Sequence, residues 1–163
     1  MPLPAAIRPD ESYLRESIAL ACASSASGAG GPFGALVVQG GIIVGRGQNR
    51  VTSTNDPTAH AEVVAIREAC AALLQFHLSG TTLYTSCEPC PMCLAAAYWA
   101  HVDRIVYAGT RDDAAAIGFD DAELYREIAL EPAKRRVPMV AMLRAEGAAV
   151  FQEWARNPQR VPY

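Results

Sequence analysis

The 163-residue sequence lacks any apolar run of about 18 residues, the length that a membrane-spanning helix needs. Its first ten residues also lack the apolar stretch of a secretory signal peptide. Internal repeats, linkers and low-complexity segments are absent as well. We therefore expect a cytoplasmic protein without membrane contact, folded as one domain over residues 1–163 around a single core.

Basic residues are too few to suggest a nucleic-acid surface. Lys and Arg together number 14 and Asp and Glu 17, which gives a formal net charge of −3. Proteins that hold phosphate backbones usually carry a basic excess or a basic stripe. The one dense basic cluster, at residues 134–136, is short. We expect no nucleic-acid partner.

Cysteines are present, but they do not form a disulfide pattern. There are five, an odd number, and three of them (Cys87, Cys90 and Cys93) fall close together. Disulfide frameworks are typical of short secreted chains with an even number of cysteines. The pattern therefore favours reduced thiols.

A two-part motif joins two of these cysteines to a histidine and a carboxylate. His60 and Glu62 form H-x-E, and Cys90 and Cys93 follow about 30 residues later in P-C-x-x-C. One imidazole and two thiolates leave one corner of a tetrahedral zinc site open, as in catalytic sites. We expect His60, Cys90 and Cys93 to bind zinc, and Glu62, which is not needed as a ligand, to carry protons.

Cys87 offers a second interpretation, because it forms C-x-x-C with Cys90. The proline directly before Cys90, and the helix expected from Pro91, favour the later pair. If Cys87 were a fourth ligand, the zinc site would be closed and the protein a non-enzymatic scaffold. Such a structural site would have no use for H-x-E.

Apolar periodicity predicts alternating helices and strands after an initial hairpin. The expected helices are 11–26, 58–76, 91–100, 120–128 and 148–156. In the first of these, Leu14, Ile18 and Cys22 form the apolar face, with Ala21 and Ser25 beside them. The expected strands are 33–39, 42–45, 81–86, 104–109 and 138–143. This order indicates an α/β fold with a helix-flanked mixed sheet. His60 and Glu62 are too far apart around a helix to cooperate on its flank, so we expect both halves of the motif at helix N-termini, where the dipoles favour thiolates.

The combination of H-x-E and P-C-x-x-C resembles the zinc-dependent deaminases of the cytidine deaminase superfamily. Further blocks are similar to short bacterial guanine deaminases: residues 30–35, Asn49, 55–62, 85–93, 98–100 and 118–121. This resemblance covers residues 12–163. It implies a three-layer α/β/α fold with a mixed five-stranded sheet, one zinc per subunit, and hydrolysis of guanine to xanthine and ammonia by zinc-activated water.

The same resemblance implies a purine pocket around the zinc. It makes Asn49 a base-binding residue, Asp121 a second acid beside Glu62 that faces the substrate amine, Phe33 a stacking face and Trp99 a pocket wall. From the residues alone, Asn49 fits a turn and Asp121 a helix cap equally well. Phe33 and Trp99 are then ordinary core residues.

The resemblance also assigns a role to the end of the chain. In the similar enzymes the C-terminal segment, here about residues 150–163, crosses to the partner of a homodimer, and the last tyrosine closes the partner's active site. Tyr163 is the final residue of this sequence. Without the resemblance, the expectation for such a terminal stretch is a disordered tail.

Other substrates share this chemistry. Guanosine, another aminopurine or an aminotriazine would need a different pocket volume, which the sequence does not reveal. tRNA adenosine deaminases and cytosine deaminases carry the same zinc motif. The chain lacks the basic C-terminal helix and the positive charge that would favour tRNA.

Overall fold

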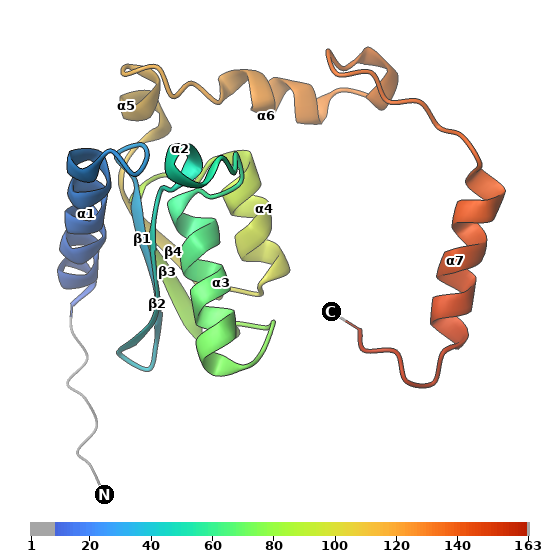
Figure 1. Cartoon of the computed structure of the whole chain (residues 1–163), viewed down its shortest axis with the longest axis horizontal. Coiled ribbons are helices and arrows are strands. Elements are labelled where there is room, and N and C mark those ends of the chain that lie inside the picture. The colour runs from blue at the N-terminus through green and yellow to red at the C-terminus, as the bar shows by residue number, and fades with distance from the viewer. Residues whose placement is uncertain (1–8, 163) are drawn as a thin grey trace, which may run out of the picture. The chain divides into compact units, whose positions relative to one another are not determined.

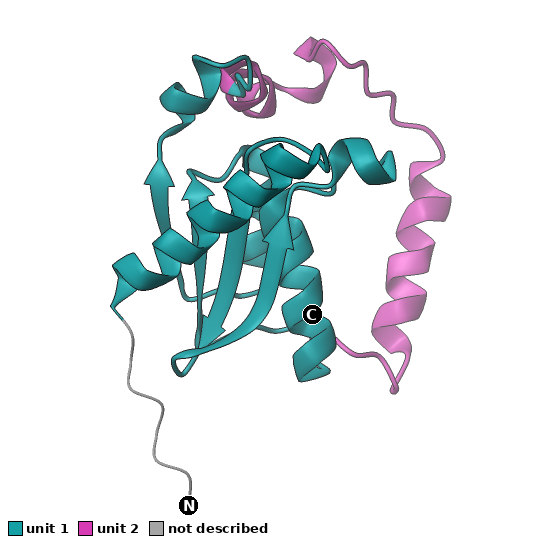
Figure 2. Cartoon of the chain, turned by 60° about the vertical axis from the view of Figure 1, so that its left-hand side comes forward, with its two compact units in different colours: residues 1–121 teal, residues 122–163 magenta. Residues whose placement is uncertain are grey.

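The computed structural model describes residues 9–162 (Figure 1). It divides into two compact units, one that ends at Asp121 and one that begins at Ala122 (Figure 2). In chain order the elements are α1 (Asp10–Ser27), β1 (Gly34–Gln39), β2 (Ile42–Gln48), α2 (Val51–Thr54), α3 (Ala61–Leu73), β3 (Thr81–Cys87), α4 (Pro91–Trp99), β4 (Arg104–Gly109), α5 (Arg111–Ala115), α6 (Ala122–Ala129), the 3-10 helix η1 (Pro132–Lys134) and α7 (Arg144–Arg156). No helix in the described part is both long and apolar enough to cross a membrane.

The first unit is built on a mixed sheet with strand order β2-β1-β3-β4. β1 pairs antiparallel with β2 and with β3, whereas β3 and β4 are parallel. The hairpin turns at Gly40 and Gly41, as the sequence predicts. The mixed α/β sheet is confirmed, but it has four strands and not the expected five.

The strand predicted at residues 138–143 is wrong. This segment is irregular and exposed, and α7 begins directly after it at Arg144. A strand satisfies its backbone groups only by pairing with another strand, and among the described residues no strand pairs with this one. The β-propensity of residues such as Val140 reflects burial in a sheet rather than a backbone preference, and Val140 is exposed here.

Helices cover both faces of the sheet, which gives the expected three layers (Figure 1). Side chains alternate along β1, so Ala35 and Val37 pack with α3 and α4 while Leu36 and Val38 pack with α1. The α3 side approaches β2 very closely. A Cβ atom on Gly47 would lie 1.9 Å from the backbone oxygen of Ala61, at the start of α3. Glycine at this position therefore lets the beginning of α3 lie directly on the sheet.

The buried face predicted for α1 is only partly right: Leu14 packs against the core and Ala21 is buried, but the rest of the face differs. Ile18 and Cys22 are exposed, and the residues turned to the core are Tyr13, Ser17, Ala21 and Ser24. The helix lies so close to β1 that small residues are needed, and both buried hydroxyls have acceptors. Ser17 donates to the oxygen of Leu14 at 2.8 Å, and Ser24 donates to the backbone oxygen of Asn49 at 2.9 Å.

Candidate active site

Both halves of the two-part motif begin helices, as the sequence predicts. His60 is the N-cap of α3, with φ −67° and ψ 153°, and Cys90 is the N-cap of α4, with φ −65° and ψ 168°. Cys93 follows in the first turn of α4 and is buried. The sheet holds these two helix N-termini together, so residues 30 positions apart in the sequence become neighbours.

Three donor atoms converge at this place. The Nδ1 atom of His60 lies 3.5 Å from Sγ of Cys90 and 3.4 Å from Sγ of Cys93, and the three ligand atoms all lie within 4.8 Å of one another. Zn–S bonds of about 2.3 Å and Zn–N bonds of about 2.0–2.1 Å at tetrahedral angles place sulfur and nitrogen about 3.6 Å apart. The observed separations fit zinc closely.

The electrostatics of the donors agree with a cation site. The pKa of Cys90 is lowered to about 4, because the side chain of Cys93 and then the ring of His60 hydrogen-bond to its thiolate. The hydrogen bond between the ring of His60 and Cys90 in turn raises the pKa of His60. The pKa of Cys93 is raised because its thiol donates to Cys90. Cys90 is therefore a ready thiolate ligand, and a bound dication stabilises the second thiolate as well.

Glu62 lies beside the donors without being one of them. It is in the first turn of α3 and only 5% exposed. Burial raises the pKa of its carboxyl, and a hydrogen bond that the carboxylate accepts from its own backbone N–H only partly offsets this. A buried carboxyl with a raised pKa exchanges protons near neutral pH more easily than an exposed one.

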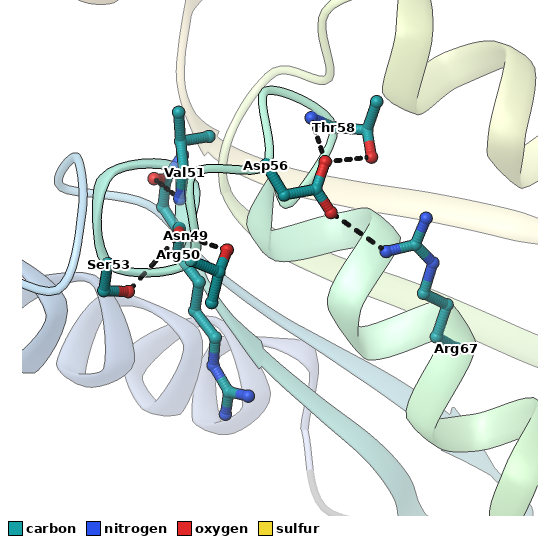
Figure 3. A network of polar contacts seen from close by, with 8 residues as sticks. Asn49, Arg50, Val51, Ser53, Asp56, Thr58 and Arg67 are labelled. Carbon is teal, nitrogen blue, oxygen red and sulfur yellow. Dashed lines mark hydrogen bonds and ion pairs between the residues drawn. The ribbon is translucent and has the colours of Figure 1, made fainter.

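Asn49 is buried directly after β2, with its side-chain oxygen occupied. Oδ1 accepts a hydrogen bond from the backbone nitrogen of Gly31 at 3.1 Å. It accepts another from the backbone nitrogen of Val51 at 3.2 Å (Figure 3). The backbone nitrogen of Asn49 donates to the oxygen of Phe33 at 3.1 Å. These bonds fix the orientation of the amide, so its nitrogen is the part of the side chain that remains for a ligand.

The loop from Asn49 to His60 is held by a local polar network (Figure 3). Oδ1 of Asp56 accepts from the nitrogen of Thr58 at 2.8 Å and from its hydroxyl at 2.6 Å. The other oxygen of Asp56 pairs with Arg67 of α3 at 3.6 Å. The network ties the loop to the helix that His60 caps, so Asn49 and the zinc donors belong to one fixed frame.

Two further expected residues, Phe33 and Asp121, lie in the same unit. Phe33 precedes β1 and is half-buried. Asp121 ends the first unit, and its pKa is raised by burial and then by the negative charge of Cys90. Asp121 follows Cys93 by 28 residues in the sequence.

Cys87 stands apart from the donor group. Its Sγ donates to the backbone oxygen of Thr110 at 3.5 Å. Burial and the surrounding carboxylates, Glu62 first among them, raise its pKa to about 11. Among the described residues, His60, Cys90 and Cys93 make up the one group of three such side chains close enough to share a metal. This geometry favours the later C-x-x-C.

The structure gives no support to the last two expected residues, for different reasons. Trp99 is at the opposite end of α4 from Cys90 and is 68% exposed, so the geometry of the single chain gives no support to a pocket wall. Tyr163 lies outside the described residues. A role for Ser24 is not apparent from the sequence, because helical apolar spacing does not single out a buried serine. Its hydroxyl donates to the backbone oxygen of Asn49 at 2.9 Å.

The chain is similar to a known family of zinc-binding proteins. A family described as the cytidine and deoxycytidylate deaminase zinc-binding region matches residues 7–109, more than half of the chain and all three donors. The chain belongs to this zinc-binding deaminase family. Its donor set therefore matches in chemistry the metal that the family binds.

Individual members of the deaminase family differ in how much of the chain they match. The guanine deaminase of Bacillus subtilis is 46% identical over 153 residues, or 94% of this chain and 98% of that protein. Its crystal structure matches with a TM-score of 0.93 over 96% of this chain and 99% of that chain. A structure of the guanine deaminase from Nitrosomonas europaea matches with a TM-score of 0.68 at 35% identity, over 74% of this chain and 70% of that one. A tRNA-specific adenosine deaminase of Agrobacterium fabrum is 47% identical, but over only 50% of this chain and 53% of its own length.

Proposed function

We propose that the protein hydrolyses guanine to xanthine and ammonia. The observation that carries this proposal is the likeness to the Bacillus guanine deaminase over nearly the whole of both chains. The likeness to the tRNA adenosine deaminase extends over only half of the chain. A shared zinc motif accounts for a match of that length, whereas a full-length match also includes the residues that surround the base.

The zinc donors and Glu62 supply the hydrolytic chemistry. When bound by His60, Cys90 and Cys93, zinc lowers the pKa of a coordinated water from about 15.7 towards 7. Glu62 would take one proton from the attacking water and pass it to a ring nitrogen of guanine, which makes the neighbouring C2 more electrophilic as the water oxygen bonds to it. Glu62 would then carry the second proton of that oxygen to the amine, so that the C2–N bond breaks and ammonia and xanthine result. A buried carboxyl with a raised pKa suits both directions of proton transfer.

Asn49, Phe33 and Asp121 bind the purine in this proposal. Because Oδ1 of Asn49 already accepts two backbone hydrogen bonds, its amide nitrogen donates to O6 or N7 of guanine. Asp121 accepts from the N–H groups on the other side of the base and acts as a second acid near the amine. Phe33 supplies the stacking face. Donor and acceptor thus meet opposite edges of guanine.

The second unit supports a swapped homodimer. Among residues 122–162 no side chain is buried, and apolar residues such as Leu124 in α6 and Phe151 in α7 are exposed. A segment with this much apolar surface needs another surface to cover it. We propose that residues 150–163 cross to a second subunit, where Tyr163 closes the active site. Deletion of residues 150–163 should convert the dimer to a monomer in sedimentation, and an unchanged dimer would contradict the exchange.

The cytoplasm is the proposed location, since free thiols and thiolate zinc ligands persist in a reducing compartment.

The proposed function is tested by the choice of substrate. Guanine, guanosine, adenine, cytosine and an aminotriazine are incubated with the zinc-loaded protein, and the ammonia released is measured. We expect the fastest release from guanine. A parallel preparation of Glu62→Gln controls for contaminating deaminases.

Three outcomes would contradict the proposal when tRNA is added to this panel. Faster release from guanosine would show a pocket that admits the ribose. Faster release from adenosine in tRNA, with binding that weakens steeply as salt rises, would show a tRNA enzyme. Absence of ammonia from every substrate, with zinc bound, would favour the non-enzymatic scaffold.

A further inference from the structure

The segment that joins β4 to Asp121 is fixed to the zinc-binding loop at its start. The backbone nitrogen of Glu88 donates to the oxygen of Gly109 at 2.8 Å, and the carboxylate of Glu88 accepts from the nitrogen of Arg111 at 3.1 Å. Glu88 lies two residues before the ligand Cys90. Residues 109–111 therefore keep a constant position relative to the metal centre.

The short helix α5 connects these fixed residues to Phe119. A capping box begins it, in which Thr110 accepts from the nitrogen of Asp113 and the Asp113 carboxylate accepts from the nitrogen of Thr110. Gly118, with φ 95°, ends the turn that follows, and the nitrogen of Phe119 donates to the oxygen of Ala114 at 3.0 Å. This reversal turns the chain back, and Phe119 meets Phe33.

The two rings form a defined contact. The centroids of Phe33 and Phe119 are 5.0 Å apart, and the ring planes are perpendicular. Gly31 lies against both. A Cβ atom at Gly31 would be 3.1 Å from the ring of Phe33 and 3.2 Å from the ring of Phe119, which is tighter than ordinary van der Waals contact. A side chain at position 31 would therefore require one of the two rings to move by a few tenths of an ångström.

We infer that Phe119 is a positioning residue for purine binding, which acts by holding the Phe33 ring in its stacking orientation. Phe33 directly precedes β1 and is only half-buried, so part of its ring is exposed. Phe119 is 48% exposed, but its backbone is tied to Ala114, and its perpendicular contact restricts the Phe33 ring before the base arrives. A ring already in place binds with less loss of entropy. The inference rests on the proposed role of Phe33 in guanine binding.

A double-mutant cycle tests this inference. Phe33→Leu, Phe119→Leu and the double variant are made in the full-length, zinc-loaded Glu62→Gln protein, and the Kd for 8-azaguanine is measured by calorimetry. We expect Phe119→Leu to raise the Kd about 3- to 10-fold in the presence of Phe33. In the Phe33→Leu background it should change the Kd by less than about twofold, because its effect passes through the missing ring. Independent, multiplicative effects would overturn the inference.

Matched variants separate positioning from folding. Phe119→Tyr keeps the ring and should bind as the parent does, while Ile117→Ala changes an exposed apolar residue of the same segment and should leave the Kd unchanged. In the active protein, Phe119→Leu should raise the KM for guanine and leave kcat within about twofold. A fall in kcat alone, or no change in Kd, would overturn the inference. If guanine gives no ammonia, the proposed function fails, and the binding cycle still decides about Phe119.

Discussion

The two units of the chain differ in what they bury. The first unit contains two apolar clusters, with Leu36 and Leu83 fully buried on opposite faces of the sheet, and it holds all three zinc donors. The second unit has helices but no buried side chain among its described residues. A metal centre needs rigid support for its ligands, and only the first unit supplies it. The zinc donors therefore belong to the unit with a packed core, whereas the other unit leaves apolar side chains such as Phe151 exposed.

Substitution of the zinc donor Cys90 should have the largest effect. Cys90→Ser removes a donor, and we expect loss of zinc and a decrease in deaminase activity of about ten-thousandfold, because the metal contributes several kcal/mol to catalysis. Cys87→Ser, the matched control in the same loop, should retain zinc and most activity. Zinc per chain is measured by atomic absorption together with ammonia release. Zinc loss in Cys87→Ser would show that the site is a closed one.

Glu62→Gln should have the second largest effect on activity. The amide keeps the shape of the buried side chain but does not accept and return a proton, so we expect kcat to fall about a thousandfold. The zinc content should stay at one per chain, because Glu62 is not a donor. Both quantities are measured on the same preparation. Unchanged ammonia release with zinc bound would contradict the role of Glu62 as proton carrier.

A pair of core and surface substitutions compares the units directly. Leu83→Ala in β3, at 0% exposure, should lower the free energy of unfolding by about 3 kcal/mol. Phe151→Ala in α7, at 76% exposure, should change it by less than about 0.5 kcal/mol. The chain has two tryptophans, one in each unit, so urea unfolding is followed by Trp99 in a Trp154→Phe background. A large loss of first-unit stability in Phe151→Ala would remove the distinction between the units.

The metal centre was predictable because its constraint is local. Two side chains at H-x-E spacing cannot cooperate on one helix flank, and this alone places His60 and Glu62 at a helix start. The same holds for Cys90, which follows a proline suited to the first turn. The observed N-caps at His60 and Cys90 confirm this. Chemistry encoded within a few residues is readable from the sequence.

The features that were missed depend on contacts between distant segments. The buried face of α1 is set by its close approach to β1, where Gly34 would clash with the Ser17 backbone if it had a Cβ atom, and not by apolar spacing along the helix. The strand expected at 138–143 lacks a pairing partner in the described structure. The orientation of Asn49 depends on a hydrogen bond from Gly31, 18 residues earlier. Each of these is decided by tertiary packing, which overrides local propensity.

Deletion of Tyr163 should have a smaller effect on turnover than either active-site substitution. It tests whether the end of the second unit takes part in the reaction. A terminal residue adds little to a core, so the free energy of unfolding should stay within about 0.5 kcal/mol. If the residue closes the site of the partner subunit and excludes water there, turnover should fall about tenfold. Mixing this variant with Glu62→Gln shows whether Tyr163 acts in the partner's active site or in that of its own subunit. A mixed dimer with an exchanged tail has one subunit with an intact Glu62 that receives the intact Tyr163 of the other, so activity should increase on mixing. Turnover equal to that of the full chain after the deletion would contradict the closing role.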